Sequence, residues 1–205
     1  MRNLLLISIC CFLLGCFQSP YQNLQASSEN SSCLGNLKPN FTSVLYMAHV
    51  NVVGKHLSGL LLFKKMPDNT TRVVFSNEMG VKFFDFEYAE SGFKVIHCIK
   101  HLDRKAVIKQ LKKDIGLVIM HNIDVSTAKI LHKDNQNYFG FFSGREQTYY
   151  LTNKTCTQLI GIENASKKQK KLIINLTDYK GGMADSIYIA HQTFEFNISL
   201  KQLER

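Results

Sequence analysis

Alternation of apolar and polar residues, with few prolines to interrupt it, constrains the fold of this chain more than any other feature. Residues 193–200 place an apolar side chain at every even position and a polar one at every odd position. This period of two, with one apolar face, is typical of an antiparallel strand that is buried on one side. Residues 172–176 and 187–189 repeat the pattern, and the chain has only 3 prolines. The sequence therefore predicts a mainly β domain (α+β) built on an antiparallel sheet.

The densest strand signals lie in residues 58–99. Leu60–Phe63 and Arg72–Phe75 flank the turn residues Pro67–Asn69, and this arrangement predicts a β-hairpin. A second connection, Asn77–Gly80, leads into a further strand. The block thus predicts consecutive antiparallel strands joined by short turns.

The strand after this second connection, residues 81–88, carries apolar groups on both faces near its start. Phe84 and Phe86 share one face, while Asp85 and Glu87 share the other and are interpreted as a solvated pair. One face can pack on a helix while the other lines a cavity. A simple two-layer core requires the same pattern, so both interpretations stay open.

One amphipathic helix is predicted over residues 103–119. Apolar residues recur at helical spacing from Val107 through Leu111 to Val118, and Asp103 is the predicted N-cap. Lysines occupy much of the remaining surface, which is typical of a solvated outer face and, alternatively, of a helix that lies on an anionic membrane. The lysine-rich run 166–171 has the same two interpretations, as a solvated hairpin loop or a headgroup contact.

The N-terminus carries an export signal. Residues 4–15 form an apolar run after a single cation, Arg2. The run is shorter than the ~20 residues that a membrane-spanning helix needs, but it suits a cleaved signal peptide. It ends in Leu13-Leu14-Gly15-Cys16, which is similar to the bacterial lipobox; the alternative is an ordinary signal peptide with a cysteine near its cleavage site. The lipobox predicts cleavage before Cys16 and acyl chains on this cysteine, and several acyl chains anchor a protein stably.

These patterns divide the chain into three parts. Residues 1–15 form the lipoprotein signal peptide, residues 16–40 the acylated cysteine with a flexible polar tether, and residues 41–205 a single domain. The formal net charge of +9 favours anionic partners such as lipid headgroups or acidic proteins. Because the chain is predicted to be exported, nucleic acid is not an expected partner.

Cysteines and glycosylation sequons give weaker signals. Cys33, Cys98 and Cys156 follow Cys16, and this odd number allows at most one internal disulfide. Cys98 has apolar neighbours, which favours a buried thiol. A secreted eukaryotic glycoprotein remains an alternative because seven Asn-x-Ser/Thr sequons begin at Asn30, Asn40, Asn69, Asn153, Asn164, Asn175 and Asn197.

The sequence contains no recognisable set of catalytic residues. The chain has no phosphate-binding loop, no Gly-x-Ser-x-Gly motif and no closely spaced cysteine pair after Cys16. His97 and His101 stand four residues apart, a spacing that suits a shared metal only on a helix, whereas they are predicted on a strand and a turn. We therefore expect a binding protein rather than an enzyme, with no metal and no cofactor beyond the covalent lipid on Cys16.

The block from residue 58 to residue 88 resembles LolB, the outer-membrane lipoprotein-localisation factor, and the LolB-like lipoproteins of the Bacteroidota within the LolA/LolB superfamily. The residues that carry the resemblance are Ser58–Lys64, Arg72–Gly80 and Phe83–Tyr88. The similarity covers about residues 44–100, and a weaker similarity extends over residues 186–203. It implies an antiparallel sheet that is curved into an incomplete β-barrel, with covering helices that close its open side over an apolar cavity for acyl chains.

The resemblance implies a role for one residue of this chain. In LolB a short Asn-Pro-Leu-Gly connection presents an exposed leucine to the membrane and helps to insert the delivered lipoprotein. The matching connection here is Asn77-Glu78-Met79-Gly80, so Met79 stands at the leucine's position in a membrane-insertion loop, unless it folds back into a tight turn. Glu78 departs from the family's proline and makes contact with an anionic surface less favourable. The ligand-cavity candidates are Leu60, Leu62, Phe84 and Phe86.

Together these features predict a monomeric, lipid-anchored protein on the periplasmic face of the outer membrane. It would bind acyl chains of lipoproteins or lipids, receive them from a periplasmic carrier protein and insert them at the outer membrane. One alternative is a non-catalytic structural lipoprotein that acts as a protein-binding scaffold in an envelope complex. Another is a secreted, N-glycosylated lipid carrier. A filled interior of the domain favours the scaffold, whereas a continuous apolar cavity favours the binding of acyl chains.

Overall fold

The computed structural model describes residues 19–27, 30–52, 54–180 and 182–203, so the predicted signal peptide and Cys16 lie outside the described residues. The strands are β1 (Gln25–Ala26), β2 (Ser43–Val52), β3 (Lys55–Lys65), β4 (Thr71–Ser76), β5 (Lys82–Ala89), β6 (Gly92–Cys98), β7 (Lys129–Lys133), β8 (Gln136–Ser143), β9 (Glu146–Asn153), β10 (Leu159–Ser166), β11 (Lys170–Lys180), β12 (Met183–His191) and β13 (Phe196–Gln202). The helices are α2 (Ser32–Asn36), α3 (Lys105–Val118) and the short 3₁₀ helix η1 (Val125–Thr127).

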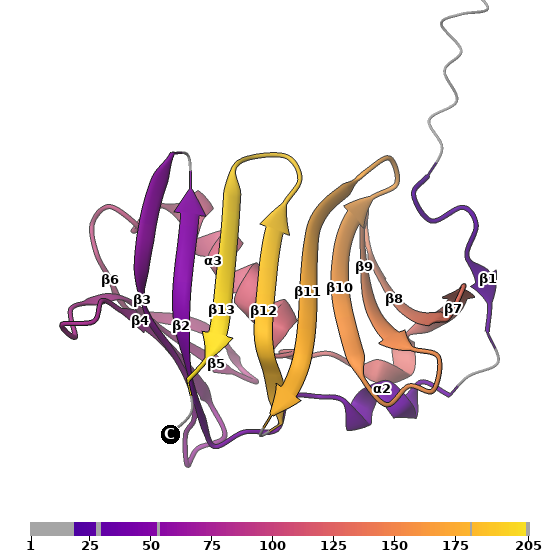
Figure 1. Cartoon of the computed structure of the whole chain (residues 1–205), viewed down its shortest axis with the longest axis horizontal. Coiled ribbons are helices and arrows are strands. Elements are labelled where there is room, and N and C mark those ends of the chain that lie inside the picture. Colours follow the sequence, from indigo (N-terminus) through magenta and orange to yellow (C-terminus); the bar gives the residue numbers. More distant parts are fainter. Residues whose placement is uncertain (1–18, 28–29, 53, 181, 204–205) are drawn as a thin grey trace, which may run out of the picture.

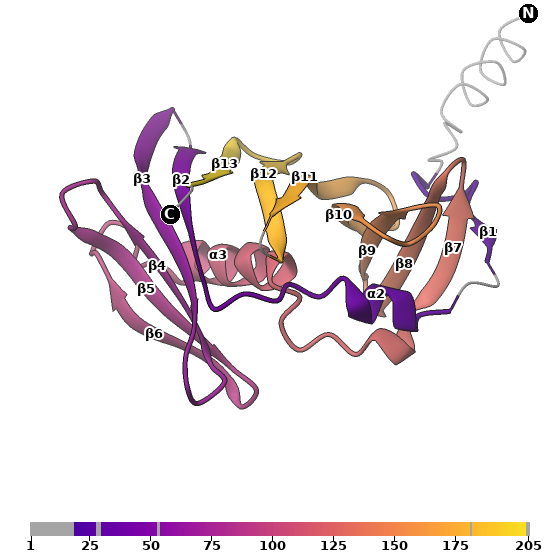
Figure 2. The same ribbon diagram turned by 60° about the horizontal axis from the view of Figure 1, so that its bottom comes forward.

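The strands of the described chain form one 13-stranded sheet in the order β1-β7-β8-β9-β10-β11-β12-β13-β2-β3-β4-β5-β6. Every pair in it is antiparallel. Figure 1 shows the central strands side by side, and Figure 2 shows the sheet curving around α3 without closing on itself. The predicted fold class, a mainly β protein with an incomplete barrel and a covering helix, is confirmed.

The predicted hairpins of the first half are confirmed as β3, β4 and β5. Leu62 lies opposite Val74, and Phe75 lies opposite Phe84. The first turn is closed by the Met66 amide, which donates to the Thr70 carbonyl at 2.9 Å. The turn chemistry of the sequence thus sets the register that aligns the apolar residues of neighbouring strands.

The predicted helix is confirmed as α3, but its predicted N-cap is wrong. Arg104 occupies the N-cap position, and no side chain caps the first amides of the helix. Asp103 lies one residue earlier, where its own amide donates to the Ile99 carbonyl at 3.0 Å. The preceding turn therefore places Asp103 outside the cap position.

Asp85 and Glu87 do not form the predicted solvated pair, because Asp85 is only 2% exposed. Its carboxylate accepts hydrogen bonds from Arg72 Nε at 2.9 Å and Arg72 Nη2 at 2.6 Å. Arg72 Nη1 also lies 3.8 Å from Glu87 Oε2. Burial of a carboxylate is costly unless a hydrogen-bonded counter-charge accompanies it, and the neighbouring strand β4 supplies that charge.

The prediction of a flexible tether is wrong for the described residues of segment 16–40. β1 pairs with β7, and a disulfide joins Cys33 of α2 to Cys156 with a Cα–Cα distance of 6.1 Å. Leu34 is completely buried, and the Asn40 amide donates to the Gly182 carbonyl at 3.2 Å. The polar composition of this segment suggested a linker, but tertiary contacts and the disulfide hold it on the domain. The remaining described cysteine is free and partly buried.

Candidate functional site

The concave face of the sheet is a continuous apolar surface. Register places Val73 between Phe63 and Phe86 on β3, β4 and β5, and it pairs Ile162 of β10 with Ile174 of β11. Directly paired residues project to the same face. All five side chains are at most 1% exposed. The alternation of apolar residues along each strand has therefore built one apolar layer across the sheet.

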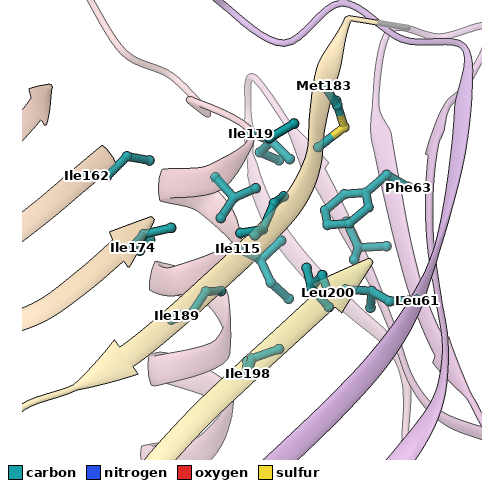
Figure 3. Close-up of a cluster of buried hydrophobic side chains, with 14 of the residues drawn as sticks. Leu61, Phe63, Ile115, Ile119, Ile162, Ile174, Met183, Ile189, Ile198 and Leu200 are labelled. Atoms are coloured by element: carbon teal, nitrogen blue, oxygen red, sulfur yellow. The ribbon is translucent and has the colours of Figure 1, made fainter. Parts of the chain in front are cut away.

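Helix α3 covers this apolar layer with its own apolar stripe. Leu111, Ile115 and Val118 are 6%, 4% and 4% exposed. Figure 3 shows Ile115 and Ile119 among side chains of the sheet that include Phe63 of β3. In this structure α3 thus packs directly on the surface that the sequence predicts to be a ligand cavity.

A buried acid–imidazole pair fastens α3 to strand β12. His191 Nε2 lies 2.8 Å from Asp114 Oδ2, and the two side chains are 3% and 0% exposed. Gln110 Nε2 donates to the other carboxylate oxygen at 2.8 Å. The imidazole also stacks on Phe194 and Phe196, with centroid distances of 4.5 Å and 5.1 Å. This pair is a buried polar contact in a largely apolar interface, so it helps to fix the register of the helix on the sheet.

A second polar contact of α3 reaches strand β9. Lys113 Nζ donates to Glu146 Oε2 at 2.7 Å and to Asn164 Oδ1 at 2.9 Å. The hydrogen bond from Lys113, together with the charges of Lys113 and Lys171, lowers the pKa of Glu146 below its usual value. Because the Glu146 side chain is 45% exposed, solvent screens the pair and its contribution to stability is small.

Two tyrosine hydroxyls bind backbone carbonyls of α3. Tyr88 of β5 donates to the Lys112 carbonyl at 3.1 Å, and Tyr150 of β9 donates to the Leu117 carbonyl at 3.1 Å. Burial raises the pKa of both hydroxyls far above the usual value, so both remain neutral donors at physiological pH. The covering helix is therefore held at several points along its length by side chains from distant strands.

The four predicted cavity residues do not share one face. Phe84 and Phe86 project to the concave face under α3, where they are 4% and 0% exposed. Leu62 pairs with Leu45 and Val74 on the opposite, convex face, and Leu60, two residues earlier on β3, lies on that face as well. A single cavity therefore cannot be lined by all four side chains, and the role of each pair as cavity residues stays a prediction. Strand alternation alone did not identify the inner face.

The β4–β5 turn presents Met79 to solvent. The Val81 amide donates to Asn77 Oδ1 at 2.8 Å, and the Asn77 amide donates to the Val81 carbonyl at 3.0 Å. Gly80 takes a positive φ of 84°, which a residue without a side chain adopts readily. Met79 is 85% exposed and Val81 is 57% exposed. The alternative in which Met79 folds back into the core is wrong, and its role at a membrane stays a prediction.

A depression of about 270 Å³ lies on the convex face. Its lining includes His49, Asn175, Tyr188 and Ser199, which are aligned with one another across β2, β13, β12 and β11. These residues alternate with the buried isoleucines of the concave face. The lining also includes Ile187 and Leu200, which belong to the buried apolar core, so the depression and the apolar layer share the same strands.

One glycosylation sequon is incompatible with a glycan in the folded domain. Asn164 is 1% exposed, and its side chain contacts Lys113 Nζ, the Gln147 carbonyl and Thr148 Oγ1. A glycan on this nitrogen would have to displace those contacts. The number of sequons in the sequence thus overstates the number of usable sites.

The polar residues that fasten α3 were missed by the sequence analysis. Asp114 lies on the same helical stripe as Leu111, Ile115 and Val118, and a carboxylate on an apolar stripe indicates a buried partner. That signal could have identified Asp114. Its partner His191 is 77 residues away in sequence and could not be found without the topology.

Comparisons with known proteins found solved structures of low similarity to this one. No family model matches the chain, and no curated protein matches its sequence. The structure is similar to that of a DUF1329 family protein from Desulfovibrio piger, with a TM-score of 0.47 and 11% identity over 85% of this chain and 88% of that one. It is also similar to a Vibrio parahaemolyticus domain named for outer membrane lipoprotein sorting, with a TM-score of 0.46 and 8% identity over 85% of this chain and 90% of that one. In the described part of this chain, no helix is long and apolar enough to cross a membrane.

Proposed function

We propose that this protein is a lipid-anchored periplasmic lipoprotein that binds acyl chains between α3 and the concave face of its sheet and delivers them to the outer membrane. The observation that carries the proposal is the continuous apolar layer of the sheet, closed by a single helix that is fastened through a few polar contacts. The incomplete barrel expected from the resemblance to LolB supports it. The reaction is transfer rather than catalysis, and no enzyme activity is proposed.

Acyl-chain binding requires α3 to move away from the sheet. Phe84 and Phe86 are 4% and 0% exposed in this structure, so a ligand chain replaces contacts that the helix now makes. Each CH₂ group removed from water stabilises the complex by about 0.8 kcal/mol. A chain of roughly ten buried CH₂ groups therefore gains about 8 kcal/mol, enough to offset the loss of several polar contacts at about 1 kcal/mol each.

An exported location is supported by the disulfide and the N-terminal sequence together. Structural disulfides persist in oxidising compartments such as the bacterial periplasm and are rare in the cytosol. The Cys33–Cys156 bond therefore agrees with the signal peptide predicted for residues 1–15. Cys16 and its acyl chains remain part of the proposal.

A second candidate function is a structural scaffold in an envelope complex. The observation that favours it is the close packing of α3 on the concave face, where Ile115 and Phe86 are 4% and 0% exposed. A scaffold would keep this core closed and use its outer surfaces for partners. Uptake of an acyl chain under α3 separates the two candidates.

Replacing Met79 with glutamate is expected to slow delivery of an acyl chain at least tenfold while leaving the fold intact. Met79 is 85% exposed, so its loss removes no core contact, whereas a carboxylate carried into the hydrocarbon region of a bilayer costs about 2.5–3.5 kcal/mol. The measurement is the transfer of a fluorescent fatty acid from the loaded protein to phospholipid vesicles. Met79→Leu is the matched control and should transfer at the parental rate. Equal rates for both variants would rule out an insertion role, and failure of the parent to load the probe would rule out the carrier function.

A further inference from the structure

The depression on the convex face is large enough to hold a small ligand. Its volume is about 270 Å³, and its lining comes from β11, β12, β13 and β2, which lie side by side in Figure 1. Small-molecule sites occupy ~300–1,000 Å³, so this volume suits a ligand of one or two small rings. The proposed acyl-chain site and the Met79 turn use none of its polar side chains.

One row of polar side chains crosses the depression from strand to strand. Tyr188 of β12 pairs with Asn175 of β11 on one side and with Ser199 of β13 on the other. Ser199 in turn pairs with His49 of β2. Directly paired residues project to the same face, and all four are exposed. The register therefore gathers an aromatic ring, an amide, a hydroxyl and an imidazole from four strands.

Tyr188 is the one large side chain at the centre of this row. It is 43% exposed, and small side chains stand next to it, Ser199 on the neighbouring strand and Ser186 two residues earlier on β12. These serines leave the hollow beside the tyrosine. The face of an aromatic ring is apolar and carries partial negative charge, so it attracts the weakly positive C–H groups of a ligand that enters the hollow.

The polar side chains around Tyr188 keep their hydrogen-bonding capacity. Within the described part of the chain, no side-chain hydrogen bond engages Asn175, Thr177 or Ser199. An amide offers two donors and an acceptor, and a hydroxyl both donates and accepts. This set of groups is complementary to a ligand that carries several hydroxyls.

The cation of the lining already has a partner. Lys201 forms an ion pair with Asp185 and donates to Ser186 Oγ at 3.1 Å. Asp185 is 4% exposed, so the lysine serves as the counter-charge of a buried carboxylate. The immediate neighbours of Tyr188 are an amide and a hydroxyl. This arrangement favours a neutral polar ligand over a phosphate or a carboxylate.

We propose that the depression binds a pyranose ring of a carbohydrate. The apolar C–H face of the sugar covers Tyr188, and its hydroxyls exchange hydrogen bonds with Asn175 and Ser199. An acyl chain at this place would bury the same polar groups without partners, which is costly. A sugar satisfies both halves of the site, because it combines an apolar ring face with a rim of hydroxyls.

The test is saturation-transfer NMR with cellobiose, lactose and N,N′-diacetylchitobiose at millimolar concentration. The full-length chain is expressed and purified under oxidising conditions in dodecylphosphocholine, a detergent without a sugar headgroup. At least one disaccharide should receive saturation, most strongly on the C–H protons of one ring face. Tyr188→Ala should weaken binding at least tenfold, because the loss of an aromatic stacking platform costs about one order of magnitude in affinity. Tyr188→Phe keeps the ring and is the matched control that should bind as the parent does.

A second variant closes the hollow without removing the tyrosine. Ser199→Ile places a β-branched side chain, which suits an exposed strand position, in the space beside Tyr188. It should abolish binding while circular dichroism shows an intact fold. Parental binding by both Tyr188→Ala and Ser199→Ile, or no saturation of any of the three disaccharides by the parent, would overturn the inference.

A further arm identifies the source of the sugar. The chain carrying Cys16→Ser is floated with phosphatidylcholine vesicles that contain or lack monogalactosyl diacylglycerol. A preference for the glycolipid that Tyr188→Ala abolishes would assign the site to a lipid headgroup, and disaccharide binding without that preference would assign it to a free glycan. Both outcomes support a sugar site. The disaccharides carry no acyl chain, so failure of the proposed function would be seen separately in the fatty-acid transfer assay.

Discussion

Cys16→Ser is expected to move this protein almost completely from the membrane fraction to the soluble fraction. The acyl chains predicted on Cys16 are the proposed anchor of the domain. Each buried CH₂ contributes about 0.8 kcal/mol, and two or more acyl chains anchor a protein stably where a single chain is marginal. The measurement is fractionation of cells followed by a high-salt wash, which removes proteins held on the membrane by electrostatic contacts alone.

Cys98→Ser is the matched control for this experiment. Cys98 is a free cysteine on β6 that is only partly buried, so the control loses a thiol without losing a disulfide. It should remain with the membrane after the wash. Retention of Cys16→Ser in the washed membrane would refute the lipid anchor.

The second large effect is expected at the pair that fastens α3, where His191→Leu should destabilise the domain by about 3–5 kcal/mol. The substitution leaves the Asp114 carboxylate, which is 0% exposed, without its imidazole partner. Removal of one member of a buried pair has a cost of this size because the other charge stays desolvated. Urea denaturation of the oxidised protein measures the loss in the free energy of unfolding.

The double variant Asp114→Leu with His191→Leu should recover most of that stability. Replacing both members of a buried pair with apolar residues is often neutral or stabilising, and residues in contact give non-additive effects in a double-mutant cycle. Hydrogen exchange in α3 should be faster in the single variant and close to the parental rate in the double variant. Additive losses from the two substitutions would show that this pair does not fasten the helix.

The β architecture could be predicted because local signals determine it. Alternation over residues 193–200 and the turn at Pro67–Asn69 both act within a few residues. The structure has the β3–β4 hairpin at the predicted turn, whereas β13 begins at Phe196, so residues 193–195 lie in the bend before this strand. The stripe from Val107 to Val118 predicted α3 for the same reason. The limit of one disulfide followed from counting cysteines.

The remaining features depend on contacts between residues that are distant in sequence. Alternation places Leu62 and Phe86 on opposite faces of their strands, but only the position of α3 decides which face is inner. Composition made residues 16–40 resemble a tether, whereas Cys33 finds its partner 123 residues away. Asp85 and Asp114 are buried because Arg72 and His191 approach them from other strands. The candidate site was therefore only half predictable, since its apolar residues follow local patterns and its polar contacts do not.

Photocrosslinking with a diazirine-bearing palmitate tests the central claim, that acyl chains bind under α3, most directly. The oxidised mature chain is loaded with the probe, irradiated and digested, and the labelled residues are identified by mass spectrometry. The account predicts labels on Phe84 or Phe86 of β5 and on Leu111 or Ile115 of α3, which unlabelled palmitate suppresses by competition. The absence of specific labelling, or labels confined to convex-face residues such as Leu60 and Leu62, would contradict it.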